Sequence, residues 1–269
     1  VDIYSRQSDH PYINETGTLT VHFIDVGQAD STFIELPTGE TMLIDAGNND
    51  DGTLVCNYIK DMGYSRIDYL IGTHPHEDHI GGLDDVIRAY DIGTIYMPKK
   101  EHTTKTFEDV LQAVKDKNLK INTAKAGVVI FADDNLTSEI VAPVNQNYDD
   151  LNNYSAVILL RYKDISFLFA GDAEKAAESA ITADINADVL KVGHHGSSTS
   201  TSPAFLKKVS PDYAVISVGA DNNYGHPDST VLNRLKTYGA EIYRTDELGT
   251  IVFSTDGREI NILSSNDIN

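Results

Sequence analysis

The sequence predicts an α/β protein built as a four-layer αββα sandwich, in which two β-sheets face each other and helices cover their outer faces. Three observations lead to this prediction. Short apolar runs typical of strands are separated by Gly, Asp, Pro and Thr, strands then alternate with segments of helical periodicity, and the alternation recurs in the second half of the chain. Two sheets with helices outside are an economical way to bury so many strands.

The first half begins with three β-type runs that predict a meander, at Leu19–Asp25, Thr32–Leu36 and Thr41–Asp45. Apolar residues then recur at helical spacing over Thr53–Met62. The run Ile67–Ile71 is almost entirely apolar, as expected of a strand buried on both faces. The elements expected after it are a helix at Asp84–Tyr90, a strand at Thr94–Met97, a helix at Phe107–Lys117 and a strand at Lys120–Ala124.

The second half repeats this plan and closes with a hairpin. The expected strands are Glu139–Ala142, Ser155–Tyr162, Ser166–Ala170, Val189–Val192, Tyr213–Ser217 and Glu241–Arg244. The expected helices are Ala173–Thr182, Pro203–Val209 and Ser229–Tyr238, and the hairpin pairs Gly249–Ser254 with Glu259–Leu263. Because no long Pro, Gly or Ser linker interrupts the pattern, we expect one domain over residues 19–269, preceded by a polar N-terminal extension at residues 1–18.

Composition limits the class of protein. A chain of 269 residues with 41% hydrophobic content can bury a large core, and no apolar run approaches the roughly 18 residues of a membrane span. The net charge of −20 argues against strong non-specific binding to a phosphate backbone, although an acidic surface also simply keeps proteins soluble.

The start at Val1 suggests a mature or excised chain, extracellular or at the cell surface, with a cytoplasmic location left open. The single cysteine, Cys56, is expected in the core.

Three histidines and a carboxylate crowd into residues 74–79, directly after the apolar run that ends at Ile71. His74 and His76 are two apart, so in an extended segment both side chains leave on the same side and can bind one ion. Asp78 and His79 follow where the chain turns into two glycines, which lets them address a second ion. The spacing predicts a dinuclear metal site, since a chance cluster of three of the nine histidines is improbable.

Further ligand candidates follow other predicted strands. Asp172 comes after an apolar strand and a tight turn, where its carboxylate could bridge two ions or cap the next helix. His194 and His195 follow another strand, with glycines on both sides that allow close backbone approach. Because adjacent side chains diverge, the two histidines could serve different ions.

The motif H-x-H-x-D-H after a strand resembles the signature of the metallo-β-lactamase superfamily of metal-dependent hydrolases. Over roughly residues 19–255 the chain is similar to the soluble domain of ComEC-type competence proteins, in the blocks Val21–Ser31, Leu43–Gly47, Leu168–Asp172, Lys191–Ser197 and Tyr224–Pro227. The resemblance implies an αββα sandwich with Asp172 as a bridging ligand. It also implies a possible membrane-channel partner, because ComEC-type proteins attach this domain to a multi-span channel.

The chain departs from the superfamily in one ligand. Many members have another metal histidine before the bridging aspartate, whereas residues 103–193 contain no histidine. One ion then has fewer protein ligands, takes His194 instead, or binds more weakly. Asn153 stands in the corresponding block and could supply an oxygen ligand or a hydrogen bond, or form a plain turn. Imidazole ligands favour Zn²⁺ and an oxygen-richer sphere favours Mn²⁺, so both remain candidates for the two ions.

Two adjacent ions can share a water, lower its pKa and clamp a phosphoryl group. The expected nucleophile is therefore a metal-bound hydroxide, with Asp78 among the catalytic ligands, and no Gly-x-Ser-x-Gly motif offers a serine instead. Asp45, at the end of a strand, is expected to orient a ligand histidine from outside the coordination sphere. Asp25 and Asp30 could do the same or hold the water, with turn formation as the alternative.

His226 is expected to bind the substrate phosphate or to protonate the leaving oxygen, with a metal-ligand or capping role as alternatives. Ser197 opens a run of hydroxyl residues that could contact phosphate oxygens. The remaining histidines lack cluster partners and are expected to be surface or structural residues: His10, His22 and His102.

Together these features predict a dinuclear metal-dependent hydrolase that cleaves phosphodiesters. The ComEC-type resemblance makes single-stranded DNA or another nucleic acid the expected substrate. The acidic charge favours an alternative, a small-phosphoester hydrolase of the phosphorylcholine esterase kind. A metal-free binding module is the non-enzymatic alternative, which the intact ligand set disfavours.

Overall fold

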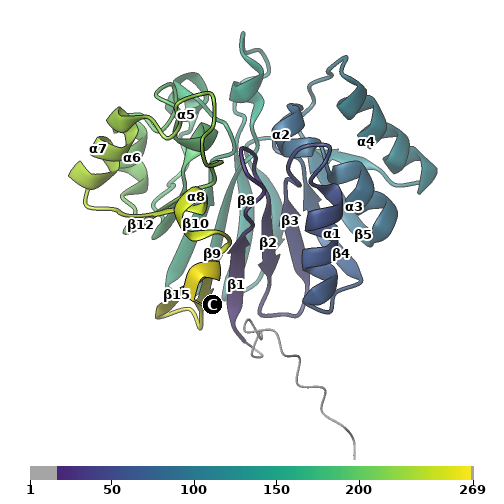
Figure 1. Ribbon diagram of the computed structural model, residues 1–269, viewed down its shortest axis with the longest axis horizontal. Helices are drawn as coiled ribbons and strands as arrows, with labels where there is room; N and C mark the ends of the chain where they lie inside the picture. Colours follow the sequence, from purple (N-terminus) through teal and green to yellow (C-terminus); the bar gives the residue numbers. More distant parts are fainter. Residues whose placement is uncertain (1–16, 268–269) are drawn as a thin grey trace, which may run out of the picture.

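The computed structural model describes residues 17–267 and places two β-sheets face to face, with helices on both outer faces (Figure 1). The strand order of one sheet is β15-β14-β1-β2-β3-β4-β5-β6, and that of the other is β13-β12-β11-β10-β9-β8-β7. The predicted αββα sandwich is therefore confirmed.

The eight-stranded sheet consists of β1 (Leu19–Phe23), β2 (Thr32–Glu35), β3 (Thr41–Ile44), β4 (Arg66–Ile71), β5 (Asp91–Met97), β6 (Ile121–Thr123), β14 (Ile251–Thr255) and β15 (Ile260–Ser264). The seven-stranded sheet consists of β7 (Val128–Ala132), β8 (Leu136–Ala142), β9 (Val157–Tyr162), β10 (Ile165–Phe169), β11 (Val189–Lys191), β12 (Tyr213–Ile216) and β13 (Glu241–Arg244).

Three longer helices lie beside each sheet, on opposite sides of the molecule in Figure 1. Those beside the eight-stranded sheet are α1 (Gly52–Asp61), α3 (Leu83–Ala89) and α4 (Lys105–Asp116). Those beside the seven-stranded sheet are α5 (Lys175–Ala180), α6 (Pro203–Val209) and α7 (Ser229–Thr237). Short helical turns complete the chain: α2 (Glu77–Ile80), α8 (Thr245–Leu248), η1 (Leu151–Tyr154), η2 (Gly193–Gly196) and η3 (Ser265–Asp267).

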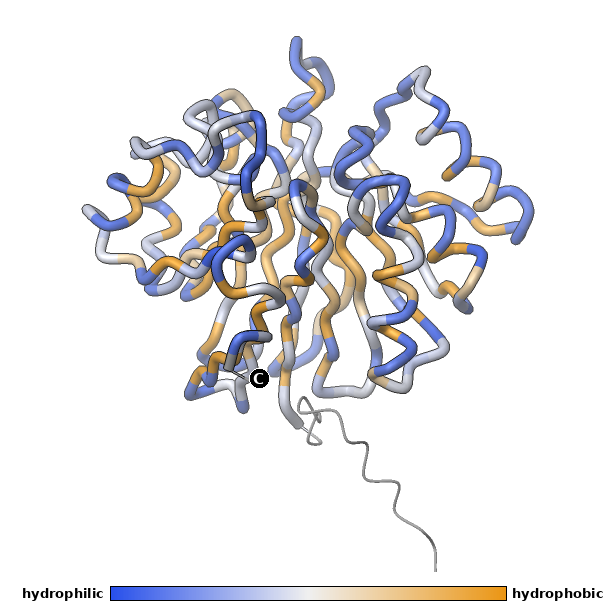
Figure 2. The backbone as a smooth tube through the Cα atoms, viewed as in Figure 1, coloured by the Kyte–Doolittle hydropathy of each residue, from blue (hydrophilic) through white to orange (hydrophobic). Residues whose placement is uncertain are grey.

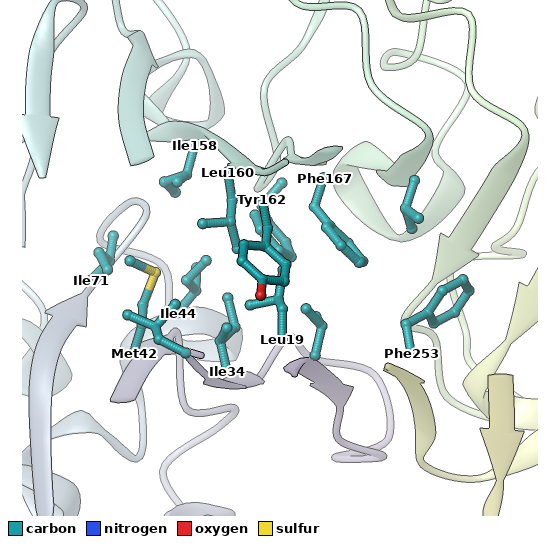
Figure 3. Close-up of a cluster of buried hydrophobic side chains, with 14 of the residues drawn as sticks. Leu19, Ile34, Met42, Ile44, Ile71, Ile158, Leu160, Tyr162, Phe167 and Phe253 are labelled. Atoms are coloured by element: carbon teal, nitrogen blue, oxygen red, sulfur yellow. The ribbon is translucent and has the colours of Figure 1, made fainter. Parts of the chain in front are cut away.

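The apolar core has three layers, one between the sheets and one under each set of helices. In the central layer, Leu19 and Ile44 of one sheet face Ile158 and Phe167 of the other (Figure 3). In Figure 2 hydrophobic residues concentrate on the central strands, and polar residues are frequent on the outer helices and loops. Burial on both faces explains why the central strands are nearly continuous apolar runs rather than alternating ones.

Parallel pairing brings the carboxyl ends of several strands to one edge. β3 to β6 pair in parallel in one sheet, and β10 to β13 do so in the other. The sheets are joined at this edge, because the Ala156 N–H donates to the Thr73 carbonyl over 2.9 Å. The loops that leave both sheets here therefore meet, and this edge is the natural place for a site.

The structure differs from the sequence prediction in a few elements. β7 was not predicted, and it is an edge strand with a bulge after Val129. The helix expected from Ala173 begins only at Lys175, because Glu174 is extended and forms a bridge with Ser200. Cys56 is half-buried at the margin of the core rather than fully inside it. No helix within residues 17–267 has the length and apolar character needed to cross a bilayer.

Of the histidines predicted to be surface or structural, His22 is confirmed as structural. His22 is fully buried in β1, with its Nε2 2.9 Å from Glu35 Oε1 and its Nδ1 2.8 Å from the Tyr58 hydroxyl. It therefore serves as a structural residue under α1. His10 lies outside the described residues.

Candidate metal centre

The H-x-H-x-D-H segment leaves β4 and turns at once into α2, which lies at the upper edge of the sheets in Figure 1. The turn is tight because it ends in two glycines. A Cβ on Gly81 would lie 2.2 Å from the backbone of Asn48, and one on Gly82 would lie 2.4 Å from the Ala46 carbonyl oxygen. This close approach allows the Ala46 N–H to donate to the His79 carbonyl over 2.8 Å, which ties α2 to the loop after β3.

Asp45 fixes the orientation of His79. One oxygen of its buried carboxylate accepts from the Thr73 N–H at 2.7 Å, and the other accepts from the Thr73 hydroxyl at 2.6 Å and lies 2.8 Å from His79 Nδ1. Since the Nδ1–H group donates a hydrogen bond to this carboxylate, the lone pair of His79 is on Nε2, which faces the interior of the site. Burial raises the pKa of Asp45 despite these hydrogen bonds.

Asp172 lies at the centre and divides its two oxygens between two sets of side chains. Its Oδ1 is 3.2 Å from His79 Nε2 and 3.9 Å from His195 Nε2. Its Oδ2 is 3.9 Å from His74 Nε2 and 3.7 Å from His194 Nε2. The two oxygens of this one carboxylate therefore face two neighbouring sets of histidine nitrogens.

We define two ligand groups on this basis. The first group is Asp78, His79, His195 and Asp172 Oδ1, whose nearest donor atoms lie within 4.8 Å of one another. The second group is His74, His76, His194 and Asp172 Oδ2, and within it His74 Nε2 is 3.0 Å from His76 Nδ1. Each group has the nitrogen and oxygen donors that Zn²⁺ or Mn²⁺ accepts.

The protonation pattern shows that these groups fit a cation. His195 Nδ1 donates to the Ser217 carbonyl at 3.0 Å, so its Nε2 lone pair faces Asp78 Oδ2 at 3.2 Å. His79 Nε2 and Asp172 Oδ1 are both buried without a hydrogen-bond partner and face each other at 3.2 Å. Lone pairs that converge at such distances require a proton or a metal ion between them.

The carboxylates create a strongly negative potential around these imidazoles. Burial alone would lower the pKa of His195, but Asp172 and Asp30 raise it to about 10. The pKa of His79 is shifted in the same direction: burial lowers it, whereas Asp172 and Asp45 raise it well above its usual value. A potential that holds a proton on a buried histidine also attracts a divalent cation, whose binding displaces that proton.

The two adjacent histidines reach different ligand groups because their backbone is left-handed. His194 has φ 51° and ψ 48°, and His195 has φ 50° and ψ 26°, a region that non-glycine residues rarely adopt. Gly193 before them has no room for a side chain, since a Cβ there would lie 2.4 Å from Ser200 Oγ. Such strained conformations concentrate at functional sites.

A buried ion pair lies behind the first ligand group. Lys191 Nζ is 2.7 Å from Asp30 Oδ2, and both side chains are almost fully buried. Asp30 Oδ1 in turn is 3.3 Å from His195 Nδ1. Sequence reasoning considered Asp30 but not Lys191. The feature of the sequence that could have revealed Lys191 is its charge, inside the otherwise apolar strand Val189–Val192.

A cavity of about 320 Å³ opens above the ligands. Besides ligand residues, it is lined by Gln28, Glu77, Asn152, Tyr224 and His226. The His226 ring stacks on Tyr224 at 5.7 Å and lies 5.7 Å from the ring of His194. Burial and the neighbouring His194 lower the pKa of His226, so its imidazole is neutral near pH 7.

Three predicted site residues have other partners. Asp25 accepts from the Gly27 N–H over 3.1 Å, as in the turn considered as its alternative. Asn153 Oδ1 accepts a hydrogen bond from the Ala177 N–H at 2.9 Å. This side chain, which belongs to η1, therefore contacts α5 and does not line the cavity. The Ser197 hydroxyl is 3.0 Å from the Thr199 hydroxyl within its own loop.

Two residues that sequence reasoning did not place at the site do lie beside it. Asn152 Nδ2 is 3.4 Å from His194 Nδ1, so the first asparagine of the pair, rather than Asn153, faces the cavity. The His102 ring is 6.3 Å from the ring of His76, in contrast to the expectation that His102 has no cluster partner. Only the loop that follows β5 brings this histidine near, and no local spacing in the sequence reveals it.

Comparison with known proteins agrees with this geometry. Residues 24–220 match the Metallo-beta-lactamase superfamily. The chain is 32% identical over 273 residues to ComE operon protein 3 of Bacillus subtilis, covering 93% of this chain and 34% of that protein. It is 30% identical over 240 residues to Recombination protein 2 of Haemophilus influenzae, covering 87% of this chain and 28% of that protein. The chain thus spans about a third of the length of these relatives.

Among solved structures, CmlA from Streptomyces venezuelae, described as a diiron beta-hydroxylase, superimposes with a TM-score of 0.58 at 14% sequence identity. The match covers 91% of this chain and 54% of CmlA and shows a shared fold. The motif order, the αββα architecture and the match over most of the sequence lead to one assignment. The chain belongs to the metallo-beta-lactamase superfamily, and its relatives include the competence-type proteins that its sequence resembles.

Proposed function

We propose that this chain is a phosphodiesterase that uses two divalent ions, Zn²⁺ or Mn²⁺, to cleave nucleic acid, with single-stranded DNA as its preferred substrate. The observation that carries the proposal is the position of Asp172, whose two carboxylate oxygens address two separate groups of histidines. A carboxylate in this position is what a dinuclear site needs as its shared ligand.

The first ligand group would hold one ion and the second group the other. In the second group His194 takes the place of the superfamily histidine that this chain lacks, since His194 Nε2 is 3.7 Å from Asp172 Oδ2. Two ions held by these residues would lower the pKa of a bound water and neutralise negative charge on a phosphodiester.

The surrounding residues keep the ligands in the required protonation state. The Nδ1–H groups of His79 and His195 donate hydrogen bonds to the Asp45 carboxylate and the Ser217 carbonyl, so that each Nε2 lone pair points inward. His226 lies across the cavity, where its neutral imidazole can donate a hydrogen bond to a phosphate oxygen or to the leaving oxygen.

Two observations favour nucleic acid as the substrate. The name of the Haemophilus influenzae relative refers to recombination, and the chain resembles ComEC-type competence proteins. The net charge of −20 excludes tight binding through long-range attraction alone, so recognition has to be local. The same charge favours a small phosphoester as the competing substrate, and the assay must separate the two.

The test is hydrolysis by metal-free protein that is resupplied with Mn²⁺ or Zn²⁺. Two substrates are compared, bis(p-nitrophenyl) phosphate and labelled single-stranded DNA. His76→Ala and Asp172→Ala remove one ligand each, and Asp61→Ala at the exposed end of α1 makes the same chemical change far from the ligands.

Cleavage of both substrates by the wild type and by Asp61→Ala, lost in the two ligand variants, supports the proposal. Cleavage of the small substrate alone points to a small-phosphoester hydrolase. If the wild type binds no divalent ion and cleaves neither substrate, the proposal is overturned.

A further inference from the structure

A second cavity, of about 520 Å³, opens at the same edge of the sheets as the histidines. Three loops form it: the loop after β5, the loop after β6 and the loop between β8 and β9. Lys99 comes from the first loop, Lys125 from the second, and Asn145, Asn147 and Tyr154 from the third. In these loops the sequence indicated a candidate role for Asn153 of the third loop, a residue that does not line this cavity.

The charge of this cavity is opposite to that of the chain. The sequence has 41 acidic residues and a net charge of −20, yet no residue that lines the cavity is acidic. Within residues 17–267, neither Lys99 nor Lys125 forms an ion pair with a carboxylate. Glu101 and Asp149 are near in sequence but do not line the cavity. Two lysines without a carboxylate partner therefore line a concave surface.

A third lysine borders the cavity. Lys100 Nζ lies 4.6 Å from the centre of the Tyr154 ring, a cation–π contact that holds the side chain against the cavity wall. Tyr154 itself is 4% exposed, and its hydroxyl donates to the Gln146 carbonyl over 3.2 Å. The tyrosine is thus a fixed part of the wall, and the lysines supply the groups that can reach a ligand.

Two segments of the chain lie beside both cavities, although the cavities have no lining residue in common. Tyr154 ends η1, and Asn152 in the same turn lines the first cavity. The loop after β5 that carries Lys99 continues to His102, whose ring is 6.3 Å from that of His76. Both cavities therefore border η1.

We propose that the second cavity binds backbone phosphates of a single-stranded nucleic acid that flank the phosphate at the metal centre, an inference that rests on the proposed function. Ammonium groups on flexible stems suit phosphates as point charges. The amide side chains of Asn145, Gln146 and Asn147 can bond to base edges, which are accessible in a single strand. Local positive charge here would let a strongly acidic protein hold a polyanion without a basic surface.

The experiment compares Lys99→Ala/Lys125→Ala with Lys115→Ala/Lys120→Ala. The control pair is equally exposed and makes the same change in net charge, but it lies at the opposite ends of α4 and β6 from the cavity. Binding of a fluorescein-labelled single-stranded DNA is measured by anisotropy in EDTA over a series of KCl concentrations. Hydrolysis of the same DNA and of bis(p-nitrophenyl) phosphate is then measured with metal.

We expect the cavity variant to bind DNA several-fold more weakly than the wild type at low salt. The slope of log K against log salt should become flatter by about 1.4, the value for two lost phosphate contacts on a single strand. The ratio of kcat/KM for DNA to that for the small substrate should fall in the cavity variant alone. Equal effects of the two variant pairs on binding would overturn the inference. Weaker binding by the cavity variant, with no hydrolysis even by the wild type, would retain the binding site and reject the proposed activity.

Discussion

Replacing Lys191 with methionine should destabilise the protein far more than the loss of an ordinary lysine. The Lys191 and Asp30 side chains are 2% and 6% exposed, and Nζ lies 2.7 Å from Oδ2. Methionine fills the space of the lysine stem but leaves the Asp30 carboxylate buried without its counter-charge. Breaking a buried ion pair on one side costs about 3–5 kcal/mol. Because His195 Nδ1 remains 3.3 Å from Asp30, we expect about 3 kcal/mol, at the lower end of that range.

The assay is urea unfolding of the metal-free protein at neutral pH, followed by circular dichroism, with the m-value as a check that the same surface unfolds. Lys105→Met provides the matched control, because Lys105 pairs with Asp109 on the exposed face of α4 and its side chain is 80% exposed. The double variant Lys191→Met/Asp30→Asn should recover part of the loss, since it removes both charges. A loss below about 1 kcal/mol for Lys191→Met, the value of a surface ion pair, would refute the reasoning.

Three further outcomes are expected. Asp45→Asn should weaken metal binding about 10–100-fold, because an amide cannot accept all three hydrogen bonds that orient His79; competition with a chromophoric chelator measures this, and unchanged affinity would contradict it. His194→Ala should reduce the metal content from two ions per chain to one by mass spectrometry, and two retained ions would remove His194 from the second ligand group. Phe167→Ala should lower the free energy of unfolding by about 3–5 kcal/mol in urea, because Phe167 is fully buried between the sheets.

The layers of the fold could be predicted because most strands are buried on both faces. A run such as Ile67–Ile71 is unmistakable whatever its partners are. The errors lie where tertiary contacts override local pattern. In residues 128–132 the exposed position Val129, at 56% exposure, is itself apolar, so the sequence lacks the apolar–polar alternation of a half-exposed strand. The start of α5 is displaced by the bridge between Glu174 and Ser200, which are 26 residues apart and which no local periodicity can join.

The candidate ligands could be predicted from the sequence because each follows a strand that ends at the same edge of a sheet. His74, His76, Asp78 and His79 are close in sequence, and Asp172, His194 and His195 each follow a buried run. The sequence did not predict which of two neighbouring side chains points toward the site. Asn152 and Asn153 are indistinguishable by sequence, yet η1 directs one to the cavity and the other to α5. Lys191 was missed because a lysine in an apolar strand shows its role only when Asp30 is seen beside it.

The left-handed backbone at residues 194 and 195 limits how this site can change by mutation. Besides glycine, asparagine, aspartate and histidine enter that conformation most readily, and β-branched side chains are nearly excluded. The His194 N–H donates to the Gly171 carbonyl at 3.0 Å and the Ser197 N–H donates to the His194 carbonyl at 2.7 Å, so the loop cannot easily relax. Among the residues that could replace histidine here and still tolerate this backbone, asparagine and aspartate also carry a metal donor. Laboratory evolution toward a new metal preference should therefore sample those two residues at position 194 and leave threonine, valine and isoleucine unused.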